Sequence, residues 1–193
     1  MAKLRSASDV PPALTKVVNQ YVSRGYSRHQ AQVIAFMLEA GQAVPDTPQI
    51  PSALVRERAA RILLEEIIET LDALGMKLMF RSNALPTLSF DSWTELDVKI
   101  PGNFQVEDDP NRQCRLLDVV DGCTDITVST TGLLSAMGVC EEPIQLQTNY
   151  ANLDKFGPGG KRREDGKWMK PPDWQPPDHE AILRKQGWNP AKE

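Results

Sequence analysis

Arg61-Ile-Leu-Leu-Glu65-Glu66-Ile-Ile-Glu69-Thr-Leu-Asp-Ala-Leu74 is the stretch that decides the fold of this 193-residue chain. Its apolar residues recur with the period of an α-helix, and Leu64 and Ile68 belong to an apolar stripe that we expect to be buried. At about 100° per residue, the three glutamates converge on one side of the same helix. Like charges this close repel each other unless a cation lies among them, whereas a solvated acidic face is the simpler interpretation of the motif alone.

A second helical pattern runs from Arg112 to about Gly138 and carries three more carboxylates. Asp118, Asp121 and Asp125 fall within about 60° of one another on a helical wheel. Aspartate is a poor helix former, and three of them on one face of an apolar helix are unfavourable without compensation. If the two acidic helices pack antiparallel, their six carboxylates form a partly buried site that needs a metal ion. Oxygen ligands without His or Cys favour Mg²⁺ or Mn²⁺ over zinc.

The first third of the chain also has helical periodicity. Residues 14–21 form a short amphipathic segment, and Ser27 caps a second helix that Gly41 ends. Prolines recur every third residue in 44–51, which excludes a helix or a central strand and predicts a rigid connector. The acidic helix follows this connector and ends at Gly75.

These patterns predict an all-α helical bundle with an irregular insertion and an extended C-terminal tail. We divide the chain into an N-terminal extension (1–26), an all-α domain (27–156) and an extended tail (157–193). Between 76 and 110 the periodicity fails, so we expect a long loop or an irregular insertion there, with a strand pair around 95–106 as one form of it. A binding or assembly loop and a variable surface insertion are both compatible with this segment.

Charge and hydropathy narrow the classes of function. The net charge of −4 argues against a general nucleic-acid-binding protein, because such proteins need a basic surface. No apolar run approaches the roughly 20 residues that span a bilayer, and the N-terminus lacks the apolar core of a signal peptide. We therefore expect a cytoplasmic protein with neither a nucleic-acid nor a membrane partner.

The two acidic motifs together resemble the signature of a known family. Glu65-Glu66-x-x-Glu69, followed by Asp118-x-x-Asp121 and Asp125, is similar to the E-E-x-x-E and E-x-x-D motifs of the MazG-like all-α nucleoside triphosphate pyrophosphohydrolases. This group includes dimeric dUTPases and phosphoribosyl-ATP pyrophosphohydrolases. At the position of Asp118 the family usually has Glu, and the shorter side chain leaves open whether Asp118, Asp121 or Asp125 ligates directly.

The likeness covers about residues 30–178. The first helix and proline connector of phage and bacterial members resemble Phe36-Met-Leu-Glu-Ala-Gly-Gln-Ala-Val-Pro-Asp-Thr-Pro48, and their second acidic helix resembles Val120-Asp-Gly-Cys-Thr-Asp-Ile-Thr-Val128. The segments 152–156 and 165–172 are similar to the N-x-x-K and D-G-K-x-x-K-P segments that follow the last helix in these proteins.

The resemblance implies hydrolysis of a nucleoside triphosphate between its α and β phosphates, which releases a nucleoside monophosphate and pyrophosphate. Two or three Mg²⁺ or Mn²⁺ ions would be held by the acidic residues Glu65, Glu66, Glu69, Asp118, Asp121 and Asp125. Glu66 and Glu69 are the expected catalytic residues. Glu65 and Glu69 are the stronger ligand candidates, and Glu66, by its offset on the helical wheel, is expected to orient the attacking water.

Other residues are candidates to bind the substrate. The phosphates are expected to contact Asn152, Lys155, Lys167 and Lys170, although solvated lysines and a helix-capping asparagine are the simpler interpretation. The base is expected to stack on Phe36, Trp93 or Tyr150, although a core or interface position is the commoner role of such residues. Phage relatives of the MazZ type remove dGTP, so dGTP is the first substrate that we name.

Two alternatives stay open. Phosphoribosyl-ATP hydrolysis would use the same metal chemistry on a substrate with an additional phosphoribose. A non-catalytic helical assembly module would bind its cation only for structure and release no pyrophosphate. Because two helices cannot enclose a nucleotide by themselves, we also expect a homodimer or homotetramer with its sites at or near the subunit interface.

Overall fold

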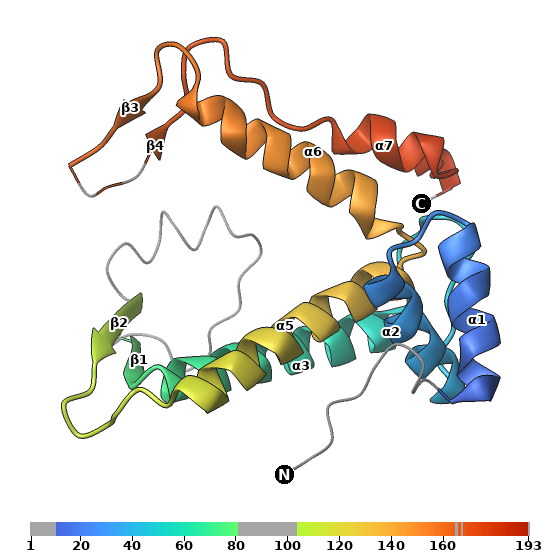
Figure 1. The fold of residues 1–193 in the computed structure, drawn as a ribbon, viewed down its shortest axis with the longest axis horizontal. Helices are drawn as coiled ribbons and strands as arrows, with labels where there is room; N and C mark the ends of the chain where they lie inside the picture. The colour runs from blue at the N-terminus through green and yellow to red at the C-terminus, as the bar shows by residue number, and fades with distance from the viewer. Residues whose placement is uncertain (1–10, 81–103, 165, 167, 193) are drawn as a thin grey trace. The chain divides into compact units, whose positions relative to one another are not determined.

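The computed structural model describes residues 11–80, 104–164, 166 and 168–192. Its described part contains the α-helices α1 (Pro12–Ser23), α2 (Arg28–Glu39), α3 (Ala53–Ala73), α5 (Leu116–Ala136), α6 (Glu141–Leu153) and α7 (His179–Lys185) (Figure 1). Two hairpins are formed by β1 (Met76–Phe80) with β2 (Phe104–Asp108) and by β3 (Lys161–Arg162) with β4 (Trp168–Met169), and two short 3-10 helices are η2 (Asp154–Phe156) and η3 (Pro190–Lys192). The fold is therefore mostly helical, which confirms the all-α prediction in its coarse form.

Contacts between residues divide the chain into two compact units. The first unit consists of Met1–Arg56 and Thr130–Glu193, and the second consists of Glu57–Ser129. The second unit is thus a continuous stretch, whereas the first is assembled from both ends of the chain.

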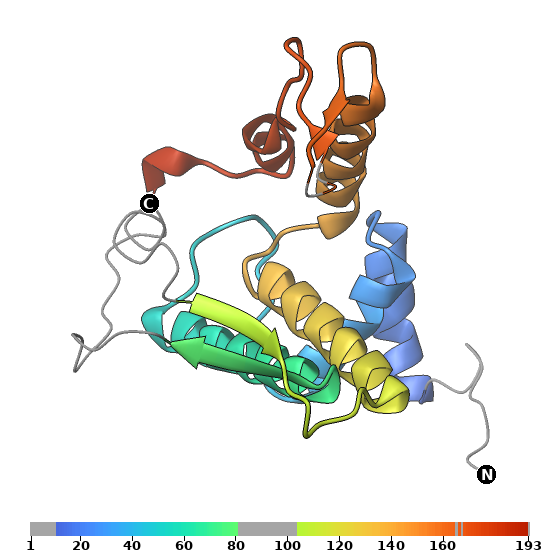
Figure 2. The same ribbon diagram turned by 90° about the vertical axis from the view of Figure 1, so that its left-hand side faces the viewer.

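Helix α1 belongs to the hydrophobic core of the first unit. Val18 and Tyr21 of α1 are buried together with Ala31 and Ile34 of α2, and the two helices lie side by side (Figure 2). Tyr21 also meets the ring of Tyr26 edge to face, with 5.2 Å between the ring centroids. The short segment predicted within the N-terminal extension is therefore a full helix, because its apolar residues recur at helical spacing and find a partner in α2.

The start and end of α2 and the proline connector agree with the sequence prediction. Ser27 Oγ accepts a hydrogen bond from the Gln30 amide at 3.1 Å. Gly41, just beyond the helix, has a φ of 72°, a value that favours glycine. Residues 44–51 form neither helix nor strand, and they dock through the Gln49 amide, which donates to the Met137 carbonyl at 2.9 Å.

A buried polar side chain joins three segments of the first unit. Gln30 is fully buried, and its Nε2 donates to Ser135 Oγ at 3.2 Å and to the Val139 carbonyl at 2.8 Å. Its Oε1 accepts a hydrogen bond from the Glu141 amide at 3.0 Å. Ser135, Val139 and Glu141 all lie more than a hundred residues from Gln30 in the sequence. The side-chain amide of Gln30 therefore joins α2 to the end of α5 and the start of α6.

The second unit has its hairpin directly after α3. Gly75, with a φ of 77°, ends the helix as predicted, and the antiparallel register runs from Met76 opposite Asp108 to Phe80 opposite Phe104. We expected a strand pair around 95–106; strand β2 begins within that range, and its partner is the segment 76–80, which was not predicted to be a strand. Residues 95–103 of the predicted pair lie outside the described residues.

The tail beyond residue 157, which we predicted to be extended, contains regular structure. It includes the β3–β4 hairpin and helix α7. Asp178 Oδ1 caps α7 by accepting a hydrogen bond from the Ala181 amide at 2.9 Å, and Arg184 pairs with Glu180 one turn earlier. Capping and this ion pair favour a helix over an extended chain. Helix α6 lies within the predicted all-α domain, although its bounds were not predicted. Within the described ranges, no helix is long and apolar enough to cross a membrane.

Candidate functional site

The acidic residues lie on α3 and α5, which are side by side in the second unit (Figures 1 and 2). The closest approach of the two helices is between Thr70 and Gly122, because a Cβ atom on Gly122 would overlap the Thr70 hydroxyl. That hydroxyl donates to the Glu66 carbonyl at 2.7 Å. A glycine one residue after Asp121 therefore lets the two acidic faces come close together.

Arginines fix the end of α3 to the start of α5. Asp72 pairs with Arg112 and, at 2.9 Å, with Arg115. The hydrogen bond from Arg115 is the main reason why the pKa of Asp72 lies below its ordinary value. Arg115 also holds Asp118 at 2.5 Å, so the charge of Asp118 is offset by an arginine. Of the six predicted carboxylates, Asp118 is thus the one that takes part in the ion pairs of Arg112 and Arg115.

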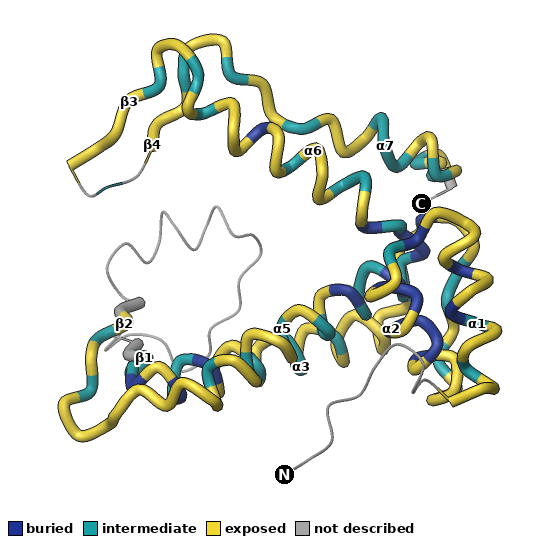
Figure 3. Tube along the Cα trace, viewed as in Figure 1, coloured by how far each residue is buried: buried dark blue, intermediate teal, exposed yellow. Residues whose placement is uncertain are grey.

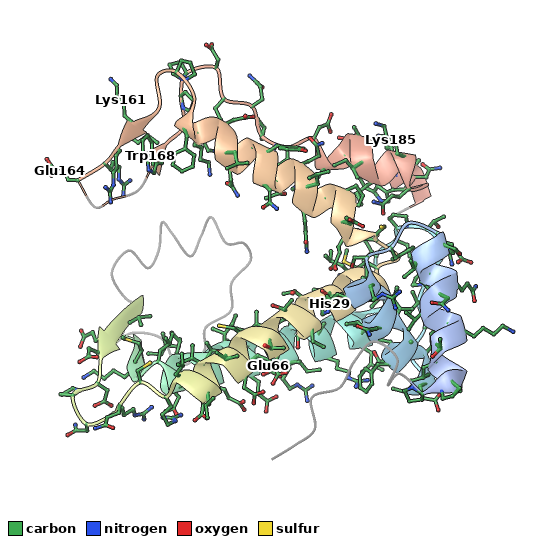
Figure 4. All side chains as sticks on the ribbon, in the orientation of Figure 1. His29, Glu66, Lys161, Glu164, Trp168 and Lys185 are labelled. Carbon is green, nitrogen blue, oxygen red and sulfur yellow. The ribbon has the colours of Figure 1, made fainter. Side chains whose placement is uncertain are left out.

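Glu66 is the electrostatic centre of the remaining carboxylates. It is half-buried, and this partial desolvation raises the pKa of Glu66 above its ordinary value. The negative charges of Asp125, Glu69, Glu65 and Asp121 raise it further. Figure 4 shows Glu66 on α3. Four of the other five predicted acidic residues therefore lie close enough for their charges to act on Glu66.

The donor set suits a hard divalent cation by its chemistry, since it consists of carboxylate oxygens alone. In the part of the chain that the structure describes, however, no group of three or more His, Cys, Asp or Glu side chains is gathered closely enough to hold a metal ion. Glutamate side chains reach different positions by rotation about their single bonds. Metal binding at this face therefore stays a prediction that requires such a rearrangement.

The predicted phosphate-binding residues of the first unit gather around a tryptophan that the sequence analysis did not single out. Lys155 Nζ donates to Asn152 Oδ1 at 2.7 Å and lies 5.8 Å from the ring centroid of Trp174. Lys170 Nζ lies 3.9 Å from the same centroid. The indole nitrogen of Trp174 donates to the Ala151 carbonyl, which anchors the ring to α6. Lys167 lies outside the described residues.

Two of the three aromatic residues predicted to stack on a base lie in the described part of the chain, and both are exposed. Phe36 is exposed on α2, Tyr150 is exposed on α6, and Trp93 lies outside the described residues. The structure pairs two other rings instead, Phe156 and Trp168, with 4.8 Å between their centroids. Eleven residues without any periodic pattern separate Phe156 from Trp168 in the sequence. The pair could therefore be recognised only from the hairpin that brings the two rings together.

Apolar side chains of α3 and α5 are exposed, although we expected the stripe on the first acidic helix to be buried. Leu64 is 57% exposed and Ile68 is 46% exposed on α3, and Leu117 is 84% exposed on α5. Figure 3 shows that exposed and half-buried residues follow most of both helices. The periodicity of a helix identifies its apolar face but does not identify what packs against that face. The described residues of this chain leave the apolar faces of α3 and α5 exposed.

The chain was compared with models of known protein families and with curated proteins, and neither comparison finds a match.

Proposed function

We propose that this protein is a metal-dependent nucleoside triphosphate pyrophosphohydrolase that converts a (d)NTP, with dGTP as the first candidate, to the (d)NMP and pyrophosphate. The observation that carries the proposal is the grouping of Glu66 with four other carboxylates on α3 and α5, whose charges add to desolvation in raising the pKa of Glu66. Repulsion of this kind is relieved when a divalent cation binds between the carboxylates. The motif resemblance supplies the reaction, and the electrostatics supply the reason why the carboxylates are grouped.

The proposal gives the acidic residues different roles. Glu65, Glu69, Asp121 and Asp125 would hold Mg²⁺ or Mn²⁺, which when bound neutralises the triphosphate and lowers the pKa of a water molecule. Glu66 orients the attacking water and accepts its proton, a role that suits a carboxylate whose pKa is raised. Asp118 acts through Arg115, because the ion pair holds that arginine in place between Asp118 and Asp72.

The lysines around Trp174 would bind the phosphate groups. Lys155 and Lys170 place two ammonium groups near one indole ring, and Asn152 orients one of them. Their positive charge would offset the negative charge of the phosphate groups that they bind. Lys167 would act with them.

The exposed apolar side chains support a homodimer or a homotetramer. Leucine and isoleucine side chains are exposed along two neighbouring helices, and a second copy of the chain would cover them in the proposed oligomer. Sedimentation of the purified protein tests this. A monomer that still turns over substrate would contradict the oligomeric part of the proposal.

The decisive experiment measures pyrophosphate release from each common NTP and dNTP, with Mg²⁺ and with Mn²⁺, and from phosphoribosyl-ATP in the same series. We expect metal-dependent release that Glu69→Ala reduces by about 100-fold or more. Glu57→Ala is the matched control, since Glu57 is an exposed carboxylate of the same helix. A flat, metal-independent background would remove the enzymatic proposal, and preference for phosphoribosyl-ATP would favour the alternative substrate.

The non-catalytic assembly module is favoured by one observation, namely that the carboxylates are not gathered as metal ligands among the described residues while apolar side chains are exposed beside them. This alternative predicts a stable oligomer, no pyrophosphate release with either metal, and little effect of Glu69→Ala on any measured activity.

A further inference from the structure

We propose that the aromatic pair Phe156 and Trp168 binds the base of a nucleotide, next to the lysines that bind its phosphates. The inference rests on the proposed function for the identity of the ligand, and it assigns the base to residues that no sequence pattern singled out. It concerns η2 and the β3–β4 hairpin, both of which belong to the first unit.

The pair presents aromatic surface to solvent. Helix η2 packs against β4, which brings the two rings to a centroid distance of 4.8 Å with 55° between their planes. Phe156 nevertheless stays 59% exposed and Trp168 stays 38% exposed. Figure 4 shows Trp168 on one strand of the hairpin and Lys161 on the other. Exposed rings that already hold each other in place provide a surface on which a planar base can stack.

Two ammonium groups flank this pair in the sequence, beside the acidic Asp154 of η2 and Glu164 of the hairpin turn. Lys155 precedes Phe156 in η2, and Lys170 follows β4 two residues after Trp168. Contact with Trp174 holds both ammonium groups near the hairpin. Among the described residues, neither of these lysines forms an ion pair with a carboxylate. An open aromatic surface, together with two ammonium groups that form no ion pair within the described part of the chain, matches a ligand that has an aromatic ring at one end and phosphates at the other.

The backbone around these residues leaves little freedom. A Cβ atom on Gly160 would overlap the Lys155 carbonyl, so the turn that follows η2 is packed directly against the lysine that carries one ammonium group. The Trp174 amide donates to the Pro171 carbonyl at 3.0 Å.

A mononucleotide fits this surface better than a nucleic-acid strand. Strand-binding proteins use a row of aromatic side chains along a basic groove, whereas the ring contact described here joins Phe156 and Trp168, and Trp174 is engaged by the two lysines. The net charge of −4 also opposes binding to a polyanion. The ligand class is therefore a nucleoside with one or more phosphates.

The test measures binding without turnover, by isothermal titration of the full chain with α,β-methylene dGTP and, separately, with pyrophosphate. Trp168→Leu keeps an apolar contact with Phe156 but removes the aromatic face, and it should weaken binding of the dGTP analogue by about tenfold or more. Trp168→Phe should restore most of that binding. Pyrophosphate has no base, so its affinity should change in Lys170→Ala and stay the same in Trp168→Leu.

Trp188→Leu is the matched control, because it removes a tryptophan outside the hairpin and should leave binding of the analogue unchanged. Equal affinity of the analogue for the wild type and Trp168→Leu would overturn the inference, as would tighter binding of a single-stranded oligonucleotide than of the mononucleotide. Failure of the proposed function looks different. In that case the analogue still binds through Trp168 but no triphosphate releases pyrophosphate.

Discussion

The hydroxyl of Thr70 on α3 lies so close to Gly122 on α5 that any side chain at position 122 would overlap it. The same hydroxyl is hydrogen-bonded to the backbone of Glu66, and Gly122 follows Asp121 directly. The spacing of the two acidic helices therefore depends on the absence of one methyl group.

Gly122→Ala should force α3 and α5 apart. We expect the free energy of unfolding to fall by about 1–3 kcal/mol, the usual cost of overpacking, and we expect metal-dependent pyrophosphate release to fall with it. Urea unfolding and the release assay measure the two effects. Gly132→Ala is the control on the same helix, because its added methyl group would meet Val33 only at an ordinary 3.9 Å. That variant should gain up to about 1 kcal/mol from its better helix propensity, and equal losses in both variants would contradict the packing argument.

Glu66→Gln should stabilise the metal-free protein. Desolvation and four neighbouring carboxylates raise the pKa of Glu66, so ionised Glu66 destabilises the folded state. The folded state holds the Glu66 proton more tightly than the unfolded state, so the advantage of glutamine is absent below the ordinary pKa of 4.5 and grows as the pH rises through the folded pKa. Thermal unfolding across this pH range measures it.

Divalent cations should make the wild type more stable than Glu66→Gln. A bound Mg²⁺ or Mn²⁺ ion interacts with the charge of Glu66 in the wild type, and this interaction is lost in the variant. Glu57→Gln serves as the control for loss of one exposed carboxylate on α3. A Glu66→Gln protein that is less stable than wild type at neutral pH without metal would show that the repulsion is absent.

Asp72→Asn should weaken the junction between α3 and α5. The hydrogen bond from Arg115, together with the charges of both arginines, lowers the pKa of Asp72, so the ion pairs stabilise the fold above the ordinary pKa of 3.8. This stability is lost as the pH falls through the lower, folded-state pKa. The difference in urea midpoint between wild type and variant should be constant at neutral pH and shrink under strong acid. Asp46→Asn, which breaks an ion pair with Arg24 whose acid is largely exposed, should have a smaller effect.

Gln30→Leu should be among the most destabilising single changes in the first unit. Leucine leaves the Val139 carbonyl and the Glu141 amide without their bonds to Gln30, and each buried unsatisfied group costs roughly 1–3 kcal/mol. Gln32→Leu makes the same substitution at an exposed position of α2 and should be nearly neutral. Thermal unfolding of the two variants measures the difference. Equal melting temperatures would show that water satisfies the Val139 carbonyl and the Glu141 amide when the Gln30 side chain is absent.

Local chemistry explains which parts of the fold could be predicted. Ser27, Gly41 and Gly75 mark helix ends through capping or a positive φ, and these depend only on neighbouring residues. The strand at 76–80 could not be predicted, because a strand needs a partner and its partner begins more than twenty residues later. Helix α7 was missed because the surrounding prolines outweighed the capping residue Asp178.

In the candidate site, only the arrangement of side chains around a single helix could be predicted from the sequence. The period of 3.6 residues places Glu65, Glu66 and Glu69 on one side of α3, and the charges that act on Glu66 agree with this. The role of Arg115 depends on where α5 begins relative to the end of α3. Contacts such as Trp174 with Lys170 depend on a chain reversal, and no periodicity encodes them.

The hydrogen bond between Gln30 and Ser135 spans 105 residues of sequence. At ribosomal rates, roughly 5 to 20 s separate the synthesis of its two ends. During that interval α1 and α2 emerge with an amide that has no buried partner, while the continuous stretch from Glu57 to Ser129 is completed. Translation therefore imposes an order of assembly on this protein, in which the first helices to be made are among the last to be locked into place.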